Sequence, residues 1–320
     1  MKIIVTGGAG FIASHITNAY IAAGHRVVVI DSLSTGFRRN VNPKAKFYKA
    51  DIRNLVLMER IFKKERPEVV NHHAAIVEVV KSIANPLLTY EVNVLGTANV
   101  LVAFGKYGPS SVRTSAGRRG TDRRFIFSST GGAIYGGPKK IPADERTPRS
   151  PLSPYSLSKS LGEDVIRFYA KQYGFAPIIF RYPNVYGPRQ NPKGEAGVIA
   201  IFGGLLKSGK RPIIFGDGTK ARDYLYVCDV VRANLMALKH GEGHTLNLGW
   251  GILVSDQMVF DEVARATGYR GKPTYAPYRK GEVYRIALDA RKAKRVLGWT
   301  PRVKLRAGIR QAIAGIRRER

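Results

Sequence analysis

The feature that most constrains this chain is Thr6-Gly7-Gly8-Ala9-Gly10, which joins a short apolar run to a helical pattern near the start of the sequence. Glycines at positions 7 and 10 allow a tight turn and let the backbone approach a phosphate group. The following helix would point its N-terminal amides and the positive end of its dipole at that phosphate. We therefore expect Gly7, Gly10, Phe11 and Ile12 to bind the pyrophosphate of a dinucleotide.

The acidic residues that end the next two strands refine this expectation. Asp31 follows the turn by about twenty residues, where a carboxylate accepts hydrogen bonds from the two adenosine ribose hydroxyls and repels a 2′-phosphate. NAD is therefore favoured over NADP, although the nearby Arg38 and Arg39 weaken the preference. Asp51 and Ile52 follow the third strand and are expected to contact the adenine.

Alternating strands and helices fill the first half of the chain. Continuous apolar strands separated by helices indicate a parallel sheet covered on both faces, and right-handed crossovers leave the doubly wound (Rossmann) arrangement of an α/β protein. The predicted strands are 2–6, 26–30, 47–50, 69–72, 124–128 and 177–181, and the predicted helices are 11–23, 55–64, 85–107 and 155–173.

The second half has a looser pattern with many loops that contain glycine and proline. We expect a dinucleotide-binding domain over 1–180 and a smaller substrate-binding lobe over 181–320, with helices near 198–208, 227–239, 255–267 and 290–297. The border is approximate, because the apolar segment 245–248 has the pattern of a strand that returns to the main sheet. Residues 106–124 are polar and basic without periodicity, which predicts an exposed insertion before the fifth strand.

A tyrosine and a lysine four residues apart form the candidate catalytic pair. Tyr155 and Lys159 would share one helical face, and an adjacent ammonium stabilises a phenolate and lowers its pKa. Such a pair can act as the general base that removes a hydroxyl proton. Thr130 is the first candidate, and Ser129 the second, for the hydroxyl that contacts the reacting oxygen, because ligands bind beyond the carboxyl ends of parallel strands.

The charge balance and composition exclude several other classes. Lys and Arg total 53 against 23 Asp and Glu, a net charge of +30 that attracts polyanions, but the basic residues are scattered and no nucleic-acid-binding motif is present. His72 and His73 lack a third ligand at useful spacing, so we expect no metal site. A single cysteine and the lack of a recognisable signal peptide or of an apolar stretch near 20 residues predict a soluble, cytoplasmic protein.

These residues together resemble the extended short-chain dehydrogenase/reductase family, and within it the UDP-glucose (UDP-galactose) 4-epimerases. The resemblance covers nearly the whole chain. Its motifs are Thr6-Gly7-Gly8-Ala9-Gly10-Phe11-Ile12, Asn93-Val94-Leu95-Gly96-Thr97, Ser128-Ser129-Thr130-Gly131-Gly132, Tyr155-Ser156-Leu157-Ser158-Lys159, Arg181-Tyr182-Pro183-Asn184, Ala221-Arg222-Asp223-Tyr224 and Arg279-Lys280-Gly281-Glu282.

The resemblance implies an isomerase that binds NAD and a UDP-sugar. Asn184, Arg222 and Arg279 would hold the uridine diphosphate, and Glu282 would bind the uridine ribose. Asn93 would support the active site through the long helix, and Asn93 and Lys159 would also contact the cofactor. The family also implies a homodimer with a four-helix interface from segments 85–107 and 155–173.

Alternative activities remain open at this point. They are a uronate or N-acetylhexosamine epimerase, a reductase and, remotely, a non-catalytic nucleic-acid-associated protein. Dehydration is disfavoured, because Gly131 and Gly132 stand where related dehydratases carry an acid. Three departures from the family are Ala13 in place of a third glycine, the 109–121 insertion and the +30 charge.

Overall fold

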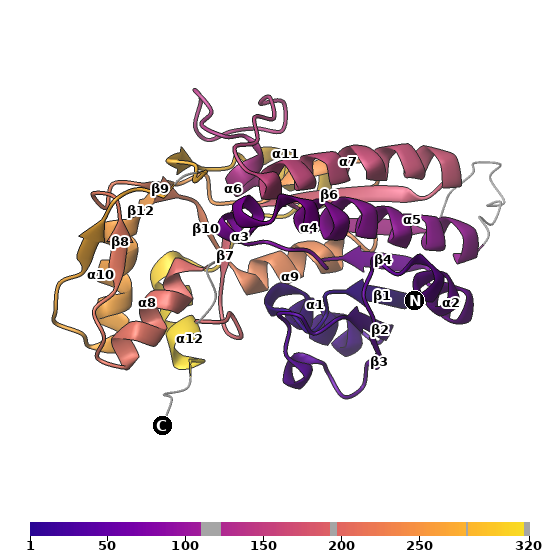
Figure 1. The fold of residues 1–320 in the computed structure, drawn as a ribbon, viewed down its shortest axis with the longest axis horizontal. Helices are drawn as coiled ribbons and strands as arrows, with labels where there is room; N and C mark the ends of the chain where they lie inside the picture. The colour runs from indigo at the N-terminus through magenta and orange to yellow at the C-terminus, as the bar shows by residue number, and fades with distance from the viewer. Residues whose placement is uncertain (110–122, 193–196, 280, 317–320) are drawn as a thin grey trace.

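A parallel sheet of seven strands organises the protein, which is described here from a computed structural model that covers residues 1–109, 123–192, 197–279 and 281–316. The strand order is β11-β6-β5-β4-β1-β2-β3, and every neighbouring pair is parallel. The order reverses between β1 and β4, so the predicted doubly wound α/β class is confirmed (Figure 1). The strands are β1 (Lys2–Thr6), β2 (Arg26–Asp31), β3 (Lys46–Lys49), β4 (Val69–His72), β5 (Arg124–Thr130), β6 (Ala176–Tyr182) and β11 (Thr245–Asn247).

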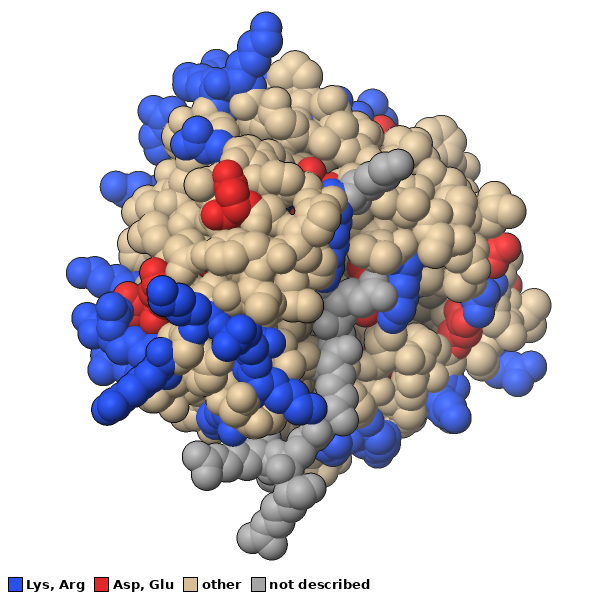
Figure 2. Space-filling model, turned by 60° about the vertical axis from the view of Figure 1, so that its left-hand side comes forward, with Lys and Arg blue, Asp and Glu red and all other residues tan. Residues whose placement is uncertain are grey.

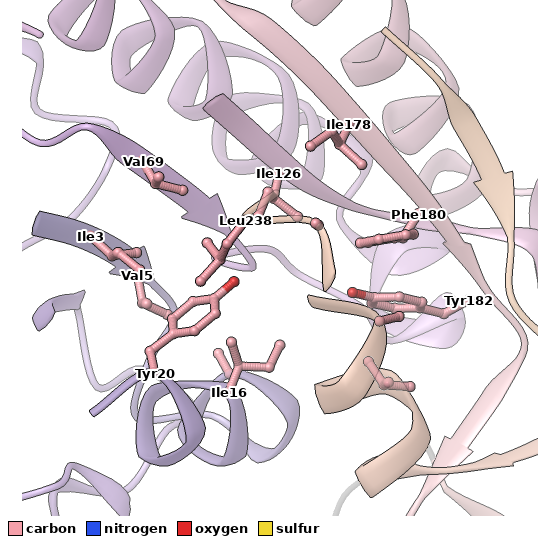
Figure 3. Packing of buried hydrophobic residues seen from close by; sticks show 14 of the residues in the cluster. Ile3, Val5, Ile16, Tyr20, Val69, Ile126, Ile178, Phe180, Tyr182 and Leu238 are labelled. Carbon is pink, nitrogen blue, oxygen red and sulfur yellow. The ribbon is translucent and has the colours of Figure 1, made fainter. Parts of the chain in front are cut away.

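Helices cover both faces of this sheet. One face packs against α1 (Phe11–Ala22), α9 (Val227–Met236) and α11 (Arg291–Leu297). The other packs against α2 (Leu55–Glu65), α5 (Gly96–Tyr107) and α7 (Pro154–Tyr173). Because both faces are buried, the central strands are mostly apolar, and Figure 3 shows Ile3, Val5, Val69, Ile126 and Ile178 pointing toward the α1 side. The shorter helices on the α7 side are α3 (Val79–Ala84), α4 (Pro86–Tyr90) and α6 (Gly131–Ile134).

The second half of the chain builds a separate lobe around its own apolar cluster. This lobe contains α8 (Val198–Lys207), α10 (Asp256–Thr267) and α12 (Leu305–Ala314), whose buried side chains pack on one another. Its short strands form small sheets with the orders β10-β7, β12-β9-β14 and β13-β8. They are β7 (Asn184–Tyr186), β8 (Ile213–Phe215), β9 (Ala221–Arg222), β10 (Tyr224–Tyr226), β12 (Val254–Ser255), β13 (Thr274–Ala276) and β14 (Arg285–Ile286).

The two halves are joined through the main sheet rather than by one linker. β11 lies far along the chain but pairs with β6, and α9 packs beside α1. The helix predicted over 85–107 is present as three consecutive segments, because a π-helical turn (Glu91–Leu95) separates α4 from α5. The predicted insertion at 109–121 lies almost wholly outside the described residues.

The expectation that no apolar stretch approaches membrane-spanning length is wrong for one segment. The helical run 86–107 is long and apolar enough by length and composition to cross a membrane. In this fold it packs against α2 and α7, with Val100, Leu101 and Phe104 fully buried. Its hydropathy therefore reflects a helix that packs into the core of an α/β domain.

We predict that Trp299→Ala lowers the free energy of unfolding by about 3–5 kcal/mol, since it removes a large buried side chain. Trp299 is fully buried, and its indole N–H donates to the Asp229 carbonyl at 2.9 Å. Chemical denaturation followed by circular dichroism measures the change. The other tryptophan, Trp250, is only partly buried, so Trp250→Ala serves as the control and should cost clearly less. Equal losses would contradict this account of the core.

Candidate active site

The glycine turn has the backbone that a bound phosphate requires. Gly7 has a φ of +70°, and a Cβ atom added there would lie 2.7 Å from the backbone nitrogen of Ala74. The Gly10 N–H donates to the Gly7 carbonyl at 2.9 Å, which closes the turn. Gly10 is also the N-cap of α1 and has no side chain to occupy the first-turn amides. The N-terminus of α1, which begins at Phe11 and Ile12, is therefore free to receive an anion.

Ala13 occupies the third glycine position of the motif, and its methyl group fits into the core. Ala13 is 2% exposed and belongs to the core between α1 and the sheet. The departure noted in the sequence is therefore accommodated by ordinary packing.

Asp31 lies beside the turn, as its place at the end of β2 requires. Its carboxylate accepts the Ala9 N–H at 2.9 Å and the Leu33 N–H at 2.7 Å, so its orientation is fixed by the backbone. Arg38 and Arg39 lie over the rings of Phe47 and Phe37, at 4.6 and 4.4 Å from the ring centroids. These stacked arginines do not form an ion pair with Asp31 within the described residues, which keeps the carboxylate available for ribose hydroxyls.

Asp51 and Ile52, which were predicted to contact the adenine, differ in their exposure to solvent. Asp51 is half-exposed and forms an ion pair with Arg53 at 2.7 Å, which lowers the pKa of the carboxyl group. Ile52 is buried, and its side chain fills the space that a Cβ at Gly96 would need. A ligand that binds Asp51 would therefore share its carboxylate with Arg53.

Tyr155 and Lys159 lie on one face at the start of α7, next to the end of β5. A reciprocal capping box fixes this first turn: the side chain of Ser153 accepts from the Ser156 N–H, and the side chain of Ser156 accepts from the Ser153 N–H. The Tyr155 hydroxyl interacts with Thr130, and Lys159 is 3% exposed, with its Nζ atom 4.5 Å from the centroid of the Phe127 ring. The structure therefore brings the predicted tyrosine, lysine and threonine together.

Burial dominates the protonation of this group. It raises the pKa of Tyr155 to about 12, and the Thr130 hydroxyl opposes that shift only weakly. It also lowers the pKa of Lys159 to about 7. In the protein chain alone the pKa of Tyr155 is therefore raised rather than lowered, because the buried phenolate loses its solvation. A positive charge beside the phenol would act in the opposite direction and favour the phenolate.

Ser129, the second candidate hydroxyl, points to another partner. Its Oγ atom donates to the buried carboxylate of Glu163 at 2.6 Å. Successive residues of a strand face opposite sides of the sheet, so Ser129 and Thr130 cannot both face the same ligand. The geometry favours Thr130 as the hydroxyl that contacts substrate.

Asn93 supports the site from the π-helical turn. Its side chain accepts the Ile76 N–H at 2.8 Å and donates to the Ile76 carbonyl and to Ser158 Oγ, both at 2.9 Å. Ser158 in turn donates to the Tyr155 carbonyl at 2.8 Å. Asn93 thereby fixes the loop after β4 against the start of α7, which indicates a positioning role beside the cofactor-binding edge.

The predicted substrate residues continue from the catalytic strand into the second lobe. Asn184 begins β7, its Oδ1 atom lies beside Gly132, and its N–H donates to the Asp223 carbonyl at 3.0 Å. The neighbouring Arg222 is 8% exposed and donates to the Tyr284 carbonyl at 2.6 Å. Asn184 therefore lies between Gly132, two residues after Thr130, and the segment that carries Arg222 in the small sheet β12-β9-β14.

Sequence reasoning missed two residues in this lobe, Phe215 and Lys220. The Arg279 guanidinium lies 3.5 Å from the centroid of the Phe215 ring. Lys220 forms an ion pair with Glu282 at 2.6 Å and lies 3.2 Å from Asp256. The available signal for Phe215 was its position just before Gly216-Asp217-Gly218. Lys220 had none, because its acidic partners come from distant segments.

Within the described residues, no group of three His, Cys, Asp or Glu side chains is placed to hold a metal ion. His72 instead contacts Thr6 Oγ1 at 2.7 Å and Thr97 Oγ1 at 2.9 Å. Burial lowers the pKa of both His72 and His73, so both imidazoles are neutral near pH 7.

We predict that Gly7→Ala abolishes retention of NAD during purification, because the added methyl group collides with the backbone of Ala74 and the left-handed backbone is strained. Gly24 has a φ of +82° but open space around its Cβ position. Gly24→Ala is therefore the matched control: it has comparable backbone strain and should retain NAD, as measured by ultraviolet absorbance of the released nucleotide. Equal loss in both variants would contradict the proposed close approach at Gly7.

Comparisons with known proteins agree with this geometry. A model of the NAD dependent epimerase/dehydratase family matches residues 3–249. The chain is 46% identical to a putative UDP-glucose 4-epimerase of Methanocaldococcus jannaschii, over 97% of each chain. The structure of a UDP-glucose 4-epimerase from Thermotoga maritima with UDP-glucose has a TM-score of 0.92 and 43% identity, with 98% of each chain covered. A Thermus thermophilus UDP-glucose 4-epimerase in complex with NAD has a TM-score of 0.89 and 39% identity, with 98% of each chain covered. This chain therefore belongs to the NAD dependent epimerase/dehydratase family, in the extended branch of the short-chain dehydrogenases/reductases.

Proposed function

We propose that this protein inverts C4 of a UDP-hexose and interconverts UDP-galactose and UDP-glucose through a 4-keto sugar. The observation that carries the proposal is the grouping of Tyr155, Lys159 and Thr130 at the carboxyl edge of the sheet that also carries the glycine turn. The relatives named UDP-glucose 4-epimerase support the same activity.

The residues present fit NAD. Gly7 and Gly10 would allow the backbone to approach the pyrophosphate, the N-terminus of α1 would supply amide donors to it, and Asp31 would accept hydrogen bonds from the ribose hydroxyls. When bound, NAD supplies a hydride acceptor at C4 of the sugar and a positive charge on its nicotinamide ring. That charge is the kind that favours the Tyr155 phenolate despite burial.

The protein side chains then divide the remaining work. Tyr155 takes the proton of the 4-hydroxyl as the carbonyl forms, and returns it when the alcohol is restored. Thr130 donates a hydrogen bond to the same oxygen, and Lys159 stabilises the phenolate. Asn184, Arg222 and Arg279 hold the diphosphate with charge-assisted hydrogen bonds, so that the sugar can turn over while the nucleotide stays bound.

Dehydration is disfavoured by the geometry after Thr130 as well as by sequence. A side chain at Gly131 would collide with Leu288, and one at Gly132 would crowd Asn184. An acid at either position would require Leu288 or Asn184 to move aside. Solved relatives include a UDP-N-acetylglucosamine 4-epimerase and a UDP-glucuronic acid 4-epimerase, so these sugars are the first substitutes to test.

We also propose that the protein is a soluble, cytoplasmic enzyme with a dinucleotide-binding part over 1–180 and a substrate lobe drawn from 181–320. The boundary is approximate, because β11, α9 and α11 return to the main sheet. A nucleic-acid or membrane partner is not part of the proposal. On the face shown in Figure 2, Lys and Arg side chains lie in several separate groups, with acidic side chains between some of them. The largest of these groups lies on the left of this view, and smaller ones lie at its top, bottom and right.

Tyr155→Phe is expected to lower kcat for UDP-galactose by roughly 10²–10⁴-fold, because it removes the general base. The assay measures UDP-glucose formation by purified protein without added NAD. Tyr173→Phe, at the other end of the same helix, is the control and should keep wild-type turnover. A wild type that is inactive even with added NAD would reject UDP-galactose as substrate and direct the search to uronates and N-acetyl sugars.

The outer surface of the two long helices supports the proposed homodimer. The helical run 86–107 and α7 lie side by side (Figure 1) and expose apolar side chains that a monomer would leave in water. The most exposed are Leu87, Leu95 and Phe168, at 72%, 60% and 63%. Two copies would bring four such helices together.

We therefore predict that Leu161→Glu combined with Phe168→Glu converts a dimer into a monomer, because charge on this face cannot be buried. Multi-angle light scattering after size exclusion measures the mass. Val56→Glu, at an exposed apolar position on α2, is the matched control and should leave the mass unchanged. A wild-type protein that elutes as a monomer would contradict the proposal.

A further inference from the structure

A buried ion pair stands directly behind the catalytic group. Glu163 of α7 is fully buried and accepts two hydrogen bonds from Arg181 of β6, from Nε at 2.8 Å and from Nη2 at 2.7 Å. Burying such a pair is costly, and apolar residues of similar volume are often as stable. Neither residue has a part in the mechanism above, so the pair calls for another explanation.

The position of Glu163 links the three catalytic side chains. Tyr155, Lys159 and Glu163 follow one another at intervals of four residues and therefore lie along one face of α7. The carboxylate also accepts the Ser129 hydroxyl at 2.6 Å, and Ser129 adjoins Thr130 at the end of β5. Glu163 thus ties the helix that carries the tyrosine and lysine to the strand that carries the threonine.

Glu163 is also the negative charge that acts on Lys159. Burial lowers the pKa of Lys159 to about 7, and the Glu163 carboxylate opposes this shift. The other titratable groups near Lys159 are Tyr155, one turn before it on α7, and His72 and His73 from the end of β4, whose imidazoles are neutral near pH 7. Around Glu163 itself lie Arg181, Arg167 at 3.1 Å and Arg149 at 3.9 Å, which keep the carboxylate ionised.

We propose that Glu163 is a positioning residue that keeps Lys159 in its ammonium form and holds α7 in register with Thr130. Arg181 keeps the Glu163 carboxylate charged and oriented. Arg181 is itself held by Tyr135, whose hydroxyl accepts a hydrogen bond from Arg181 Nη1 at 2.7 Å and donates one to Asn247 at 2.8 Å. The inference rests on the proposed function, since it concerns the same catalytic group.

Glu163→Gln is the central test, because it keeps the shape of the side chain and removes its charge. Loss of a nearby negative charge lowers the pKa of every titrating group around it. The alkaline limb of the kcat–pH profile, which reports loss of the Lys159 proton, should therefore move to lower pH by roughly half to one unit. Glu163→Asp keeps the charge, so its kcat should fall while its alkaline limb stays in place.

Ser129→Ala separates the hydrogen bond from the charge and should lower kcat without moving the limb. If Glu163→Gln does not fold, because Arg181 is left buried without a partner, the double variant Glu163→Gln with Arg181→Met removes both charges. The shift to lower pH should keep its direction but be smaller in it, because loss of the Arg181 positive charge opposes the loss of the Glu163 negative charge, and Glu163 lies one helical turn from Lys159. The proposal is overturned if folded Glu163→Gln has a lower kcat but an alkaline limb at the wild-type pH, as Glu163→Asp is expected to have. Glu163 would then have a merely structural role.

A readout without substrate keeps this inference distinct from the proposed function. Titration of the Lys159 ε-carbon by NMR, in protein with labelled lysine and assigned through Lys159→Arg, measures the lysine pKa directly. It should fall in Glu163→Gln and stay unchanged in Ser129→Ala. If the wild type does not turn over UDP-galactose, the proposed function fails while this titration still decides the role of Glu163.

Discussion

The structure depends on the requirement that parallel strands be joined by crossovers. Because each strand of the main sheet runs in the same direction, every carboxyl end reaches the same edge, and the chain must cover both faces with helices. At the reversal between β1 and β4 the flanking loops separate, and this is where Gly7, Asp31 and the loop after His72 meet. The dinucleotide turn and the catalytic strand β5 are thus brought to one edge by topology, before any side chain contributes.

At that edge, burial sets the chemistry as much as the choice of residues does. An ammonium beside a phenol should lower the phenol pKa, yet burial raises the pKa of Tyr155 to about 12 and lowers that of Lys159 to about 7. Both shifts have one cause: a charged form loses solvation in a closed site. A positive charge placed beside Tyr155 would lower its pKa again and so favour the phenolate.

Sequence patterns predicted the elements of the main sheet because their signals are local. Strands such as β1 and β2 are continuous apolar runs with β-branched residues, and each is followed by a helix with its own period. The second lobe gave weaker signals, since β9, β12 and β14 are two residues long and are defined only by pairing with distant partners. The amphipathic helix α12 was overlooked because it follows a short basic loop without a recognisable cap.

The same distinction holds for the candidate site. The residues that a motif places together, Gly7 with Gly10 and Tyr155 with Lys159, lie together in the structure. The partners that decide what each side chain does come from far along the chain: Glu163 binds the Ser129 hydroxyl, and Lys220 binds Glu282. Charge pairing of this type leaves no spacing in the sequence, because three-dimensional packing alone brings the groups together. A motif therefore indicates which chemistry a site can support, whereas the buried partners decide the charge that each group carries there.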